Sequence, residues 1–298
     1  MDKKPYIGLL ISIISVSFAA IFITTILIIA PGTDPLAIAF YRLFFTALLI
    51  VPVVVIHKKT RDELLNLPRK TMLIMIVIGV ILAVHFAFWI TSLNYTSVAS
   101  SVILVTAHPV LVAPVAHYFL KEKLSRVNIF GITISLFGVV LLVAGNYGLS
   151  SLSFDSLEGN IFAILGGIAA GLYILGGRKI RKTVSIIPYA FVVYSIGTIV
   201  LLGICLSART PLINLKIEVY QICLLMAVVS GIFGHTLYNW SLGHVRASLA
   251  SVVLLGEPLG STILAVIIPW INQIPSKYTI IGGAIILSGI YLTARNNR

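Results

Sequence analysis

Long apolar runs alternate with short polar links along the whole chain. As an α-helix, each run of roughly 17 to 25 residues would cross the hydrocarbon core of a bilayer, which is about 30 Å thick. Of the 298 residues, 59% are hydrophobic and 10% are charged, too few charges to cover a water-soluble protein of this length. The pattern predicts an all-α membrane protein with ten transmembrane helices. The predicted spans are residues 6–30, 35–56, 71–91, 97–120, 127–144, 159–177, 187–206, 219–241, 246–269 and 278–294.

The polar links differ in charge between the two sides of the predicted bilayer. With a cytoplasmic N-terminus, 17 of the 21 lysines and arginines fall at the termini or in links on the cytoplasmic side, and three fall on the opposite side. Since cytoplasmic links are rich in these residues, both termini are predicted to lie in the cytoplasm of a cell-membrane protein. The net charge of +12 follows from this bias and does not indicate nucleic-acid binding. The first apolar run continues to Ala30 without a cleavage site, which favours a retained helix over a signal peptide.

The second half of the chain repeats the first. Residues 92–115 align without a gap with residues 241–264. The predicted repeats are residues 1–146 and 147–298. Because each contains five helices, the second repeat crosses the membrane in the opposite sense. Further correspondences, after a shift of two residues, pair Gly131 with Gly282 and Gly138 with Gly289. Inverted repeats are typical of secondary transporters, whose binding site lies between the repeats near the bilayer midplane.

The alignment also places a polar residue followed by proline at equivalent positions: His108-Pro109 and Glu257-Pro258. Proline has no N–H to donate to the carbonyl four residues earlier, so each pair predicts a helix break. Glu257 lies about eleven residues into its span, roughly 16 Å along the helix and close to the midplane. A carboxylate at that depth costs on the order of 3 kcal/mol unless water or a partner reaches it. We therefore expect Glu257 and His108 to bind the substrate or a proton, with a purely structural role as the alternative.

Other candidates are aromatic and polar residues, most of which share helix faces at spacings of three or four. They are His85 and Trp89 in the third span, His235, Tyr238 and Asn239 in the eighth, and Phe18 and Tyr173 in the first helix of each repeat. The alignment pairs Trp89 with Tyr238. We expect these residues to line a pathway, although tryptophan and tyrosine at headgroup depth also act as interfacial anchors.

Arg42 lies within the second span, about seven residues or roughly 10 Å from its start. It can reach the interface or bind backbone carbonyls as a structural residue, or it can bind a substrate carboxylate. The sequence favours the structural role.

Three segments carry a resemblance to a known family: FYRLFFTALLI (40–50), SVILVTAHPVLVAPVAHYFLKEKLS (101–125) and LLGEPLGSTILAV (254–266). In their order and spacing, nearly the whole chain resembles the EamA-type proteins of the drug/metabolite transporter superfamily. The resemblance implies small-molecule transport across the inner or plasma membrane, often the export of amino acids or related metabolites. The chain departs from the pattern at His108, which precedes the proline of the fourth span. It also has no counterpart of KEKLS after the ninth span.

The leading hypothesis is a secondary transporter for a small polar or amphipathic metabolite, such as an amino acid. It would work by alternating access, as an exporter or a facilitator, with protons as a second partner if transport is coupled. No cofactor, metal or nucleic acid is expected, and the protein is predicted to be a monomer or a homodimer.

Three alternatives remain. An exchanger for sugar phosphates or nucleotide sugars would need Lys or Arg at depth, where only Arg42 qualifies. An intramembrane enzyme would need a nucleophile–base or metal-ligand motif, and the sequence contains no His-Glu-x-x-His or Gly-x-Ser-x-Gly. A receptor-like role would leave the equivalent helix breaks unexplained.

Overall fold

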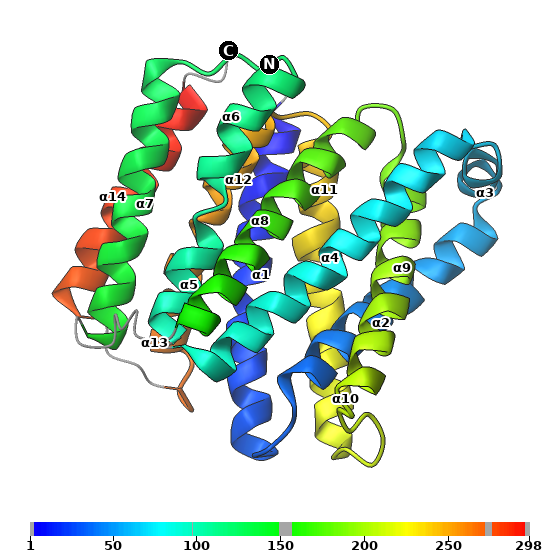
Figure 1. Cartoon of the computed structure of the whole chain (residues 1–298), viewed down its shortest axis with the longest axis horizontal. Coiled ribbons are helices and arrows are strands. Elements are labelled where there is room, and N and C mark those ends of the chain that lie inside the picture. Colours follow the sequence, from blue (N-terminus) through cyan, green and yellow to red (C-terminus); the bar gives the residue numbers. More distant parts are fainter. Residues whose placement is uncertain (1–2, 97, 149–156, 272–275, 296–298) are drawn as a thin grey trace. The chain divides into compact units, whose positions relative to one another are not determined.

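The chain folds into α-helices in a computed structural model that describes residues 3–96, 98–148, 157–271 and 276–295. Within these ranges, ten helical spans are long and apolar enough to cross a membrane, which confirms the predicted fold class. The elements, labelled as in Figure 1, are α1 (Lys4–Ile29), α2 (Pro35–Ile56), α3 (Lys58–Leu65), α4 (Arg69–Tyr95), α5 (Val98–Thr106), α6 (Pro109–Phe119), α7 (Arg126–Tyr147), α8 (Leu157–Ile180), α9 (Ile186–Ser207), α10 (Ile217–Met226), the π-helix η2 (Ala227–Thr236), α11 (Leu237–Leu242), α12 (Ala247–Leu254), α13 (Glu257–Ile267) and α14 (Lys277–Arg295). Three spans consist of consecutive segments, namely α5–α6, α10–η2–α11 and α12–α13, and α3 is a short polar connection.

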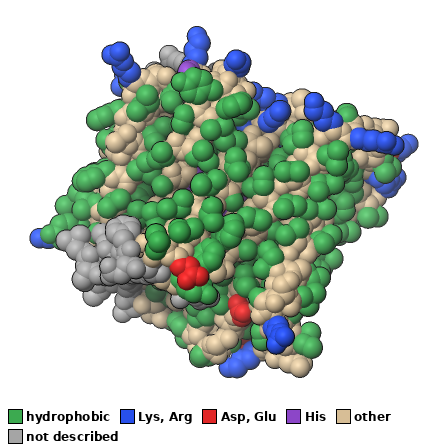
Figure 2. Space-filling view, viewed as in Figure 1, with side chains coloured by type: hydrophobic (Ala, Val, Ile, Leu, Met, Phe, Trp, Pro, Cys, Tyr) green, Lys and Arg blue, Asp and Glu red, His purple; other side chains and the backbone are tan. Residues whose placement is uncertain are grey.

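The helix ends follow from local side-chain chemistry. At the start of α2, Asp34 accepts a hydrogen bond from the Leu36 backbone N–H at 2.9 Å. At the start of α7, Ser125 and Asn128 each accept a hydrogen bond from the other's backbone N–H, both at 3.1 Å. Between their ends the membrane-spanning helices are mostly apolar, and Figure 2 shows hydrophobic side chains over much of the visible surface, with Lys and Arg toward its edges.

The helices form two compact packing units. The first comprises Met1–Ala87 and Gly176–His244, and the second comprises Phe88–Leu175 and Val245–Arg298. Each unit therefore combines helices from both halves of the chain, and α4 and α8 each contribute residues to both units. The packing units do not coincide with the predicted sequence repeats.

In the first unit, α1 packs against α10, η2 and α11, and α2 packs against α9, α10 and η2. Small residues bring η2 close to its neighbours. A Cβ at Gly234 would lie 2.8 Å from Val16 of α1, and a Cβ at Gly231 would overlap Thr46 of α2. The Ser230 hydroxyl donates a hydrogen bond to the Ser15 carbonyl at 3.0 Å. The π-helical turn is therefore fixed between α1 and α2.

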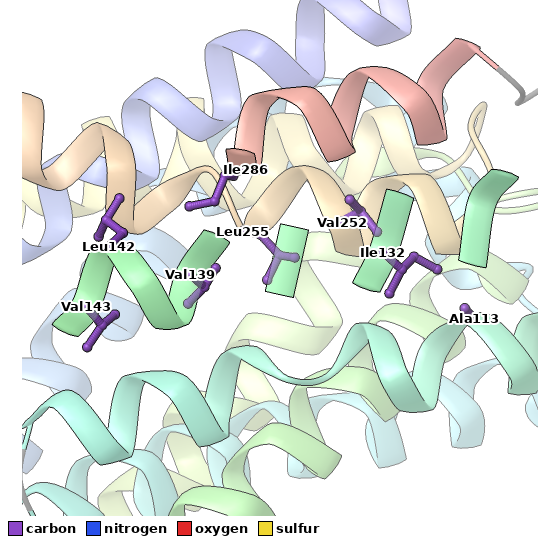
Figure 3. Packing of buried hydrophobic residues seen from close by; sticks show 8 residues of the cluster. All are labelled: Ala113, Ile132, Val139, Leu142, Val143, Val252, Leu255 and Ile286. Carbon is purple, nitrogen blue, oxygen red and sulfur yellow. The ribbon is translucent and has the colours of Figure 1, made fainter. Parts of the chain in front are cut away.

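In the second unit, α7 and α14 run antiparallel in close contact. A Cβ at Gly138 would lie 2.8 Å from the Gly282 carbonyl, and one at Gly282 would lie 2.5 Å from the Leu142 nitrogen. Gly131 and Gly289 meet in the same way further along the pair, so each glycine faces the repeat counterpart of the other glycine on its own helix face. A cluster of buried apolar residues fills the space beside it: Ala113, Ile132, Val139, Leu142, Val143, Val252, Leu255 and Ile286 (Figure 3).

The fourth and ninth spans are each divided near the middle. Pro109 is the first residue of α6, and Pro258 is the second residue of α13. Before each break, the last turn tightens to hydrogen bonds between residues three apart, from Ala107 N–H to Leu104 at 3.4 Å and from Gly256 N–H to Val253 at 2.9 Å.

Candidate functional site

The first unit contains a small pocket that is lined by apolar side chains together with a few polar ones. Its lining residues come from α2, α4, α9 and η2, and they are Arg42, Leu43, Thr46, Leu82, Phe86, Tyr194, Gly231 and His235. The volume of about 10 Å³ is enough for roughly one water molecule. Because α2 and α4 come from the first half of the chain and α9 and η2 from the second, both repeats contribute to the pocket.

Arg42 and His235 form the polar centre of this pocket. Arg42 Nη2 lies 2.7 Å from His235 Nε2, and the arginine side chain is only 6% exposed. The guanidinium carbon also lies 5.3 Å from the centre of the Phe86 ring, where the electrons of the ring face attract a cation. Arg42 is therefore held from two sides inside a predicted membrane span.

The Arg42–His235 contact defines the protonation state of the histidine. A guanidinium group carries only donors, so Nε2 of His235 must be the acceptor in this hydrogen bond. The histidine is then neutral, with its proton on Nδ1. Extending the gap-free repeat alignment by six residues pairs Phe86 with His235, and their ring centroids are 6.3 Å apart.

A buried hydrogen-bond network extends from the pocket along the first unit. The Asn239 amide donates to the His235 carbonyl at 2.7 Å and to the Tyr194 hydroxyl at 3.4 Å. That hydroxyl lies 3.3 Å from Thr236 Oγ1. At the far end, Arg181 Nε donates to the Asn239 carbonyl at 3.2 Å, and burial lowers the pKa of Arg181 below its ordinary value. Asn239, one of the residues selected from the sequence, thus connects the pocket to the α8–α9 link.

The remaining candidates of the first unit lie around this network. The His85 ring is 5.2 Å from the Phe86 ring, beside the pocket. Tyr238 is 2% exposed, and its hydroxyl has no hydrogen-bond partner among the described residues. Phe18 stacks on Phe22 of the same helix, with ring centroids 6.0 Å apart.

The second unit contains the two polar–proline pairs. Glu257 is the first residue of α13, so its carboxylate lies in the first turn, where free N–H groups and the helix dipole favour a negative charge. Pro258 beside it gives up no helix hydrogen bond at that position. His108 is 8% exposed and directly precedes α6. Glu-Pro in mid-span is therefore the beginning of a new helix, which explains how the membrane tolerates it.

Trp89 and Tyr173 also belong to the second unit. A Cβ at Gly166 of α8 would lie 3.1 Å from the Trp89 nitrogen, so α4 and α8 meet closely at this point. Tyr173, further along α8, is 5% exposed. Tyr238, the repeat counterpart of Trp89, lies in the first unit.

Six of the eight lining residues were not selected from the sequence: Leu43, Thr46, Leu82, Phe86, Tyr194 and Gly231. Three of them are polar or aromatic, namely Thr46, Phe86 and Tyr194. Thr46 follows Arg42 by one helical turn and donates to its carbonyl at 2.7 Å, a spacing that could have identified it. Phe86 could have been found as the repeat counterpart of His235. Tyr194 carries no sequence signal, because only the packing of α9 beside η2 brings it to the pocket.

In the part of the chain that the structure describes, no group of three or more His, Cys, Asp and Glu residues is placed to hold a metal ion. Cys205 and Cys223 are free and buried thiols. Of the charged and titratable candidates, Arg42 belongs to the first unit, and Glu257 and His108 belong to the second.

The family model and the relatives that match this chain are all named as transporters. Residues 6–144 and 157–295 each match the EamA-like transporter family. An uncharacterized transporter of Archaeoglobus fulgidus is 27% identical over 268 residues, covering 87% of this chain and 88% of the relative. The uncharacterized transporter YyaM of Bacillus subtilis is 25% identical, covering 76% and 74%. One from Clostridium kluyveri is 22% identical, covering 99% and 94%. A solved crystal structure shares the fold with a TM-score of 0.80 at 16% identity, covering 100% of this chain and 99% of the other.

Proposed function

Because the chain belongs to the EamA-like transporter family, we propose that it transports a small amphipathic metabolite bearing a carboxylate, such as an amino acid. The protein is a multi-pass membrane transporter. We further propose that it works as a secondary transporter by alternating access, as an exporter or facilitator whose direction follows the gradients.

One observation supports the choice of a carboxylate. Arg42 is buried in a membrane span, where its guanidinium contacts His235 and the Phe86 ring at a pocket lined by both repeats. A planar guanidinium matches a carboxylate with two parallel hydrogen bonds, and such charge-assisted bonds are strong where water is scarce. The pocket has room for about one water molecule in this conformation, so a metabolite enters only when the surrounding helices move apart.

The same observation argues against a phosphate substrate. A dianionic phosphate calls for more than one deep cation, and Arg42 is the one Lys or Arg remote from the helix ends in the described spans. For Glu257, in the first turn of α13, we retain the sequence-based proposal that it contacts the transported molecule or a proton.

A transport assay with matched molecules tests the proposed function. Proteoliposomes that carry the purified protein are loaded with the twenty amino acids in turn, and with 4-methylpentanoate and 3-methylbutylamine, which are leucine without its amine and without its carboxylate. We expect exchange of at least one amino acid together with the acid, and none of the amine. Transport of the amine as fast as the acid, or of no carboxylate at all, would contradict the proposal.

We also propose that both termini and α3 face the cytoplasm, following the distribution of Lys and Arg. Two cysteine substitutions test this orientation: Asn66→Cys at the end of α3 and Ala208→Cys after α9. Both positions are exposed, and the proposal places them on opposite sides of the membrane. In intact cells, a membrane-impermeant maleimide is expected to label position 208 and not 66. The native Cys205 and Cys223 are buried and serve as the unlabelled background. Labelling of position 66 alone would reverse the orientation.

A further inference from the structure

We propose that Arg42 and His235 form a proton-linked carboxylate site, in which His235 takes up one proton each time a carboxylate binds to Arg42. This rests on the proposed function and adds to it a coupling partner, the proton, and the residue that holds it. The inference starts from the 2.7 Å contact between Arg42 Nη2 and His235 Nε2.

The contact with Arg42 excludes a proton from Nε2 of His235. Arginine donates in every hydrogen bond it makes, so the contact exists only while Nε2 is an unprotonated acceptor. A proton on Nε2 would leave two donors facing each other and two positive charges in contact. Both effects oppose protonation, and the low dielectric of a buried site increases the repulsion.

A bound carboxylate makes protonation of Nε2 favourable instead. Placed between the two side chains, it accepts hydrogen bonds from the guanidinium and from a protonated Nε2, and its charge offsets one of the two positive charges. An N–H bond forms at Nε2 and an O–H bond of a hydronium ion breaks, in the water on the side of the membrane to which the site is open. The hydrogen bond between Arg42 and His235 is replaced by their hydrogen bonds to the carboxylate. One anion and one proton therefore bind together, so a monocarboxylate would add no net charge to the site.

Among the described residues, the groups that face His235 from the neighbouring helices include no Asp or Glu. Besides Arg42 of α2, they are His85 of α4, which interacts electrostatically with His235, and Tyr194 of α9 across the pocket. Cys223 of α10 interacts with Arg42, and α1 meets η2 through Ser15 and Val16, which do not titrate. The eight lining residues include no carboxylate. The counter-charge for a protonated His235 is therefore supplied by the bound molecule.

Proton uptake on binding gives a direct test. Purified protein in weakly buffered detergent solution is titrated with 4-methylpentanoate and with each of the twenty amino acids while a pH dye reports protons. For the molecules that bind wild type, we expect about one proton taken up per molecule bound near neutral pH. Their affinity should rise about tenfold for each unit of pH decrease, as linkage requires of a proton that binds with them.

Two variants assign the proton to its residue. His235→Gln keeps a carbonyl that can accept from Arg42 but cannot titrate, so it should bind the same molecules without proton uptake and with an affinity independent of pH. His57→Gln is the matched control, because it removes an exposed histidine that directly follows α2, and it should keep the proton uptake of wild type. Should His235→Gln not fold, ¹⁵N spectra of histidine-labelled wild type replace it. His235 is assigned by replacing the other five histidines one at a time, and its ring should change from the neutral Nδ1–H form to the doubly protonated form on binding.

The outcomes separate the inference from the function on which it rests. If none of these carboxylates binds wild type, the proposed function fails and the inference fails with it. If a carboxylate binds without proton uptake, or if His235→Gln still takes up the proton, carboxylate transport stands and the role of His235 is overturned.

Discussion

Replacing Arg42 by methionine is expected to weaken carboxylate binding by about a hundredfold, equivalent to about 3 kcal/mol. A two-point, charge-assisted contact in a dry pocket is of that order. The substitution removes a buried charge and fills its volume with an apolar chain, which in buried sites is often neutral for stability. Binding should therefore be lost while the protein remains folded, and calorimetric titration with 4-methylpentanoate or with a transported amino acid measures the loss.

Two further substitutions define what Arg42 contributes. Arg42→Lys keeps the charge but loses the planar fork, so we expect a loss of about tenfold, between wild type and methionine. Arg61→Met removes an exposed arginine of α3 and should bind as wild type does. Unchanged affinity of folded Arg42→Met would return Arg42 to the structural role that the sequence favoured, with the substrate carboxylate bound elsewhere.

The apolar pattern predicted the spans well because membrane helices must bury every backbone polar group within a long apolar run. The second predicted span, 35–56, has the same ends as α2. The helix interruptions were also readable, since proline cannot donate a hydrogen bond in any surroundings. Pro109 and Pro258 stand at the beginnings of α6 and α13 for this local reason.

The pocket was only partly predictable. His235 and Arg42 were each selected from the sequence, but as unrelated residues. They lie 193 positions apart in the chain. Their meeting depends on the packing of α2 against η2 and on the π-helical turn of η2. A π-helical turn inserts an extra residue per turn and has no fixed sequence pattern. The sequence repeat also gave no indication that helices of both halves would pack together in each unit.

Gly282→Leu is expected to lower the stability of the second unit by about 3 kcal/mol, near the upper end for overpacking. In the described structure, a Cβ at Gly282 would lie 2.5 Å from the Leu142 nitrogen and 2.7 Å from the Gly138 carbonyl. Both contacts are with the backbone of α7, which cannot rotate away as a side chain would. Membrane helices that meet through small residues depend on this close approach, since lipid supplies little hydrophobic force to hold them together.

Gly203→Leu provides the matched control for this prediction. Gly203 lies within α9, another apolar span, and a Cβ there would meet nothing within 4 Å. The same change of residue should therefore leave the melting temperature in detergent nearly unchanged, whereas Gly282→Leu should lower it by roughly 6–10 °C. A similar decrease in both variants would show that leucine is disfavoured in these helices generally. No decrease in Gly282→Leu would show that α7 and α14 can separate at no cost, and that their close packing does not stabilise the unit.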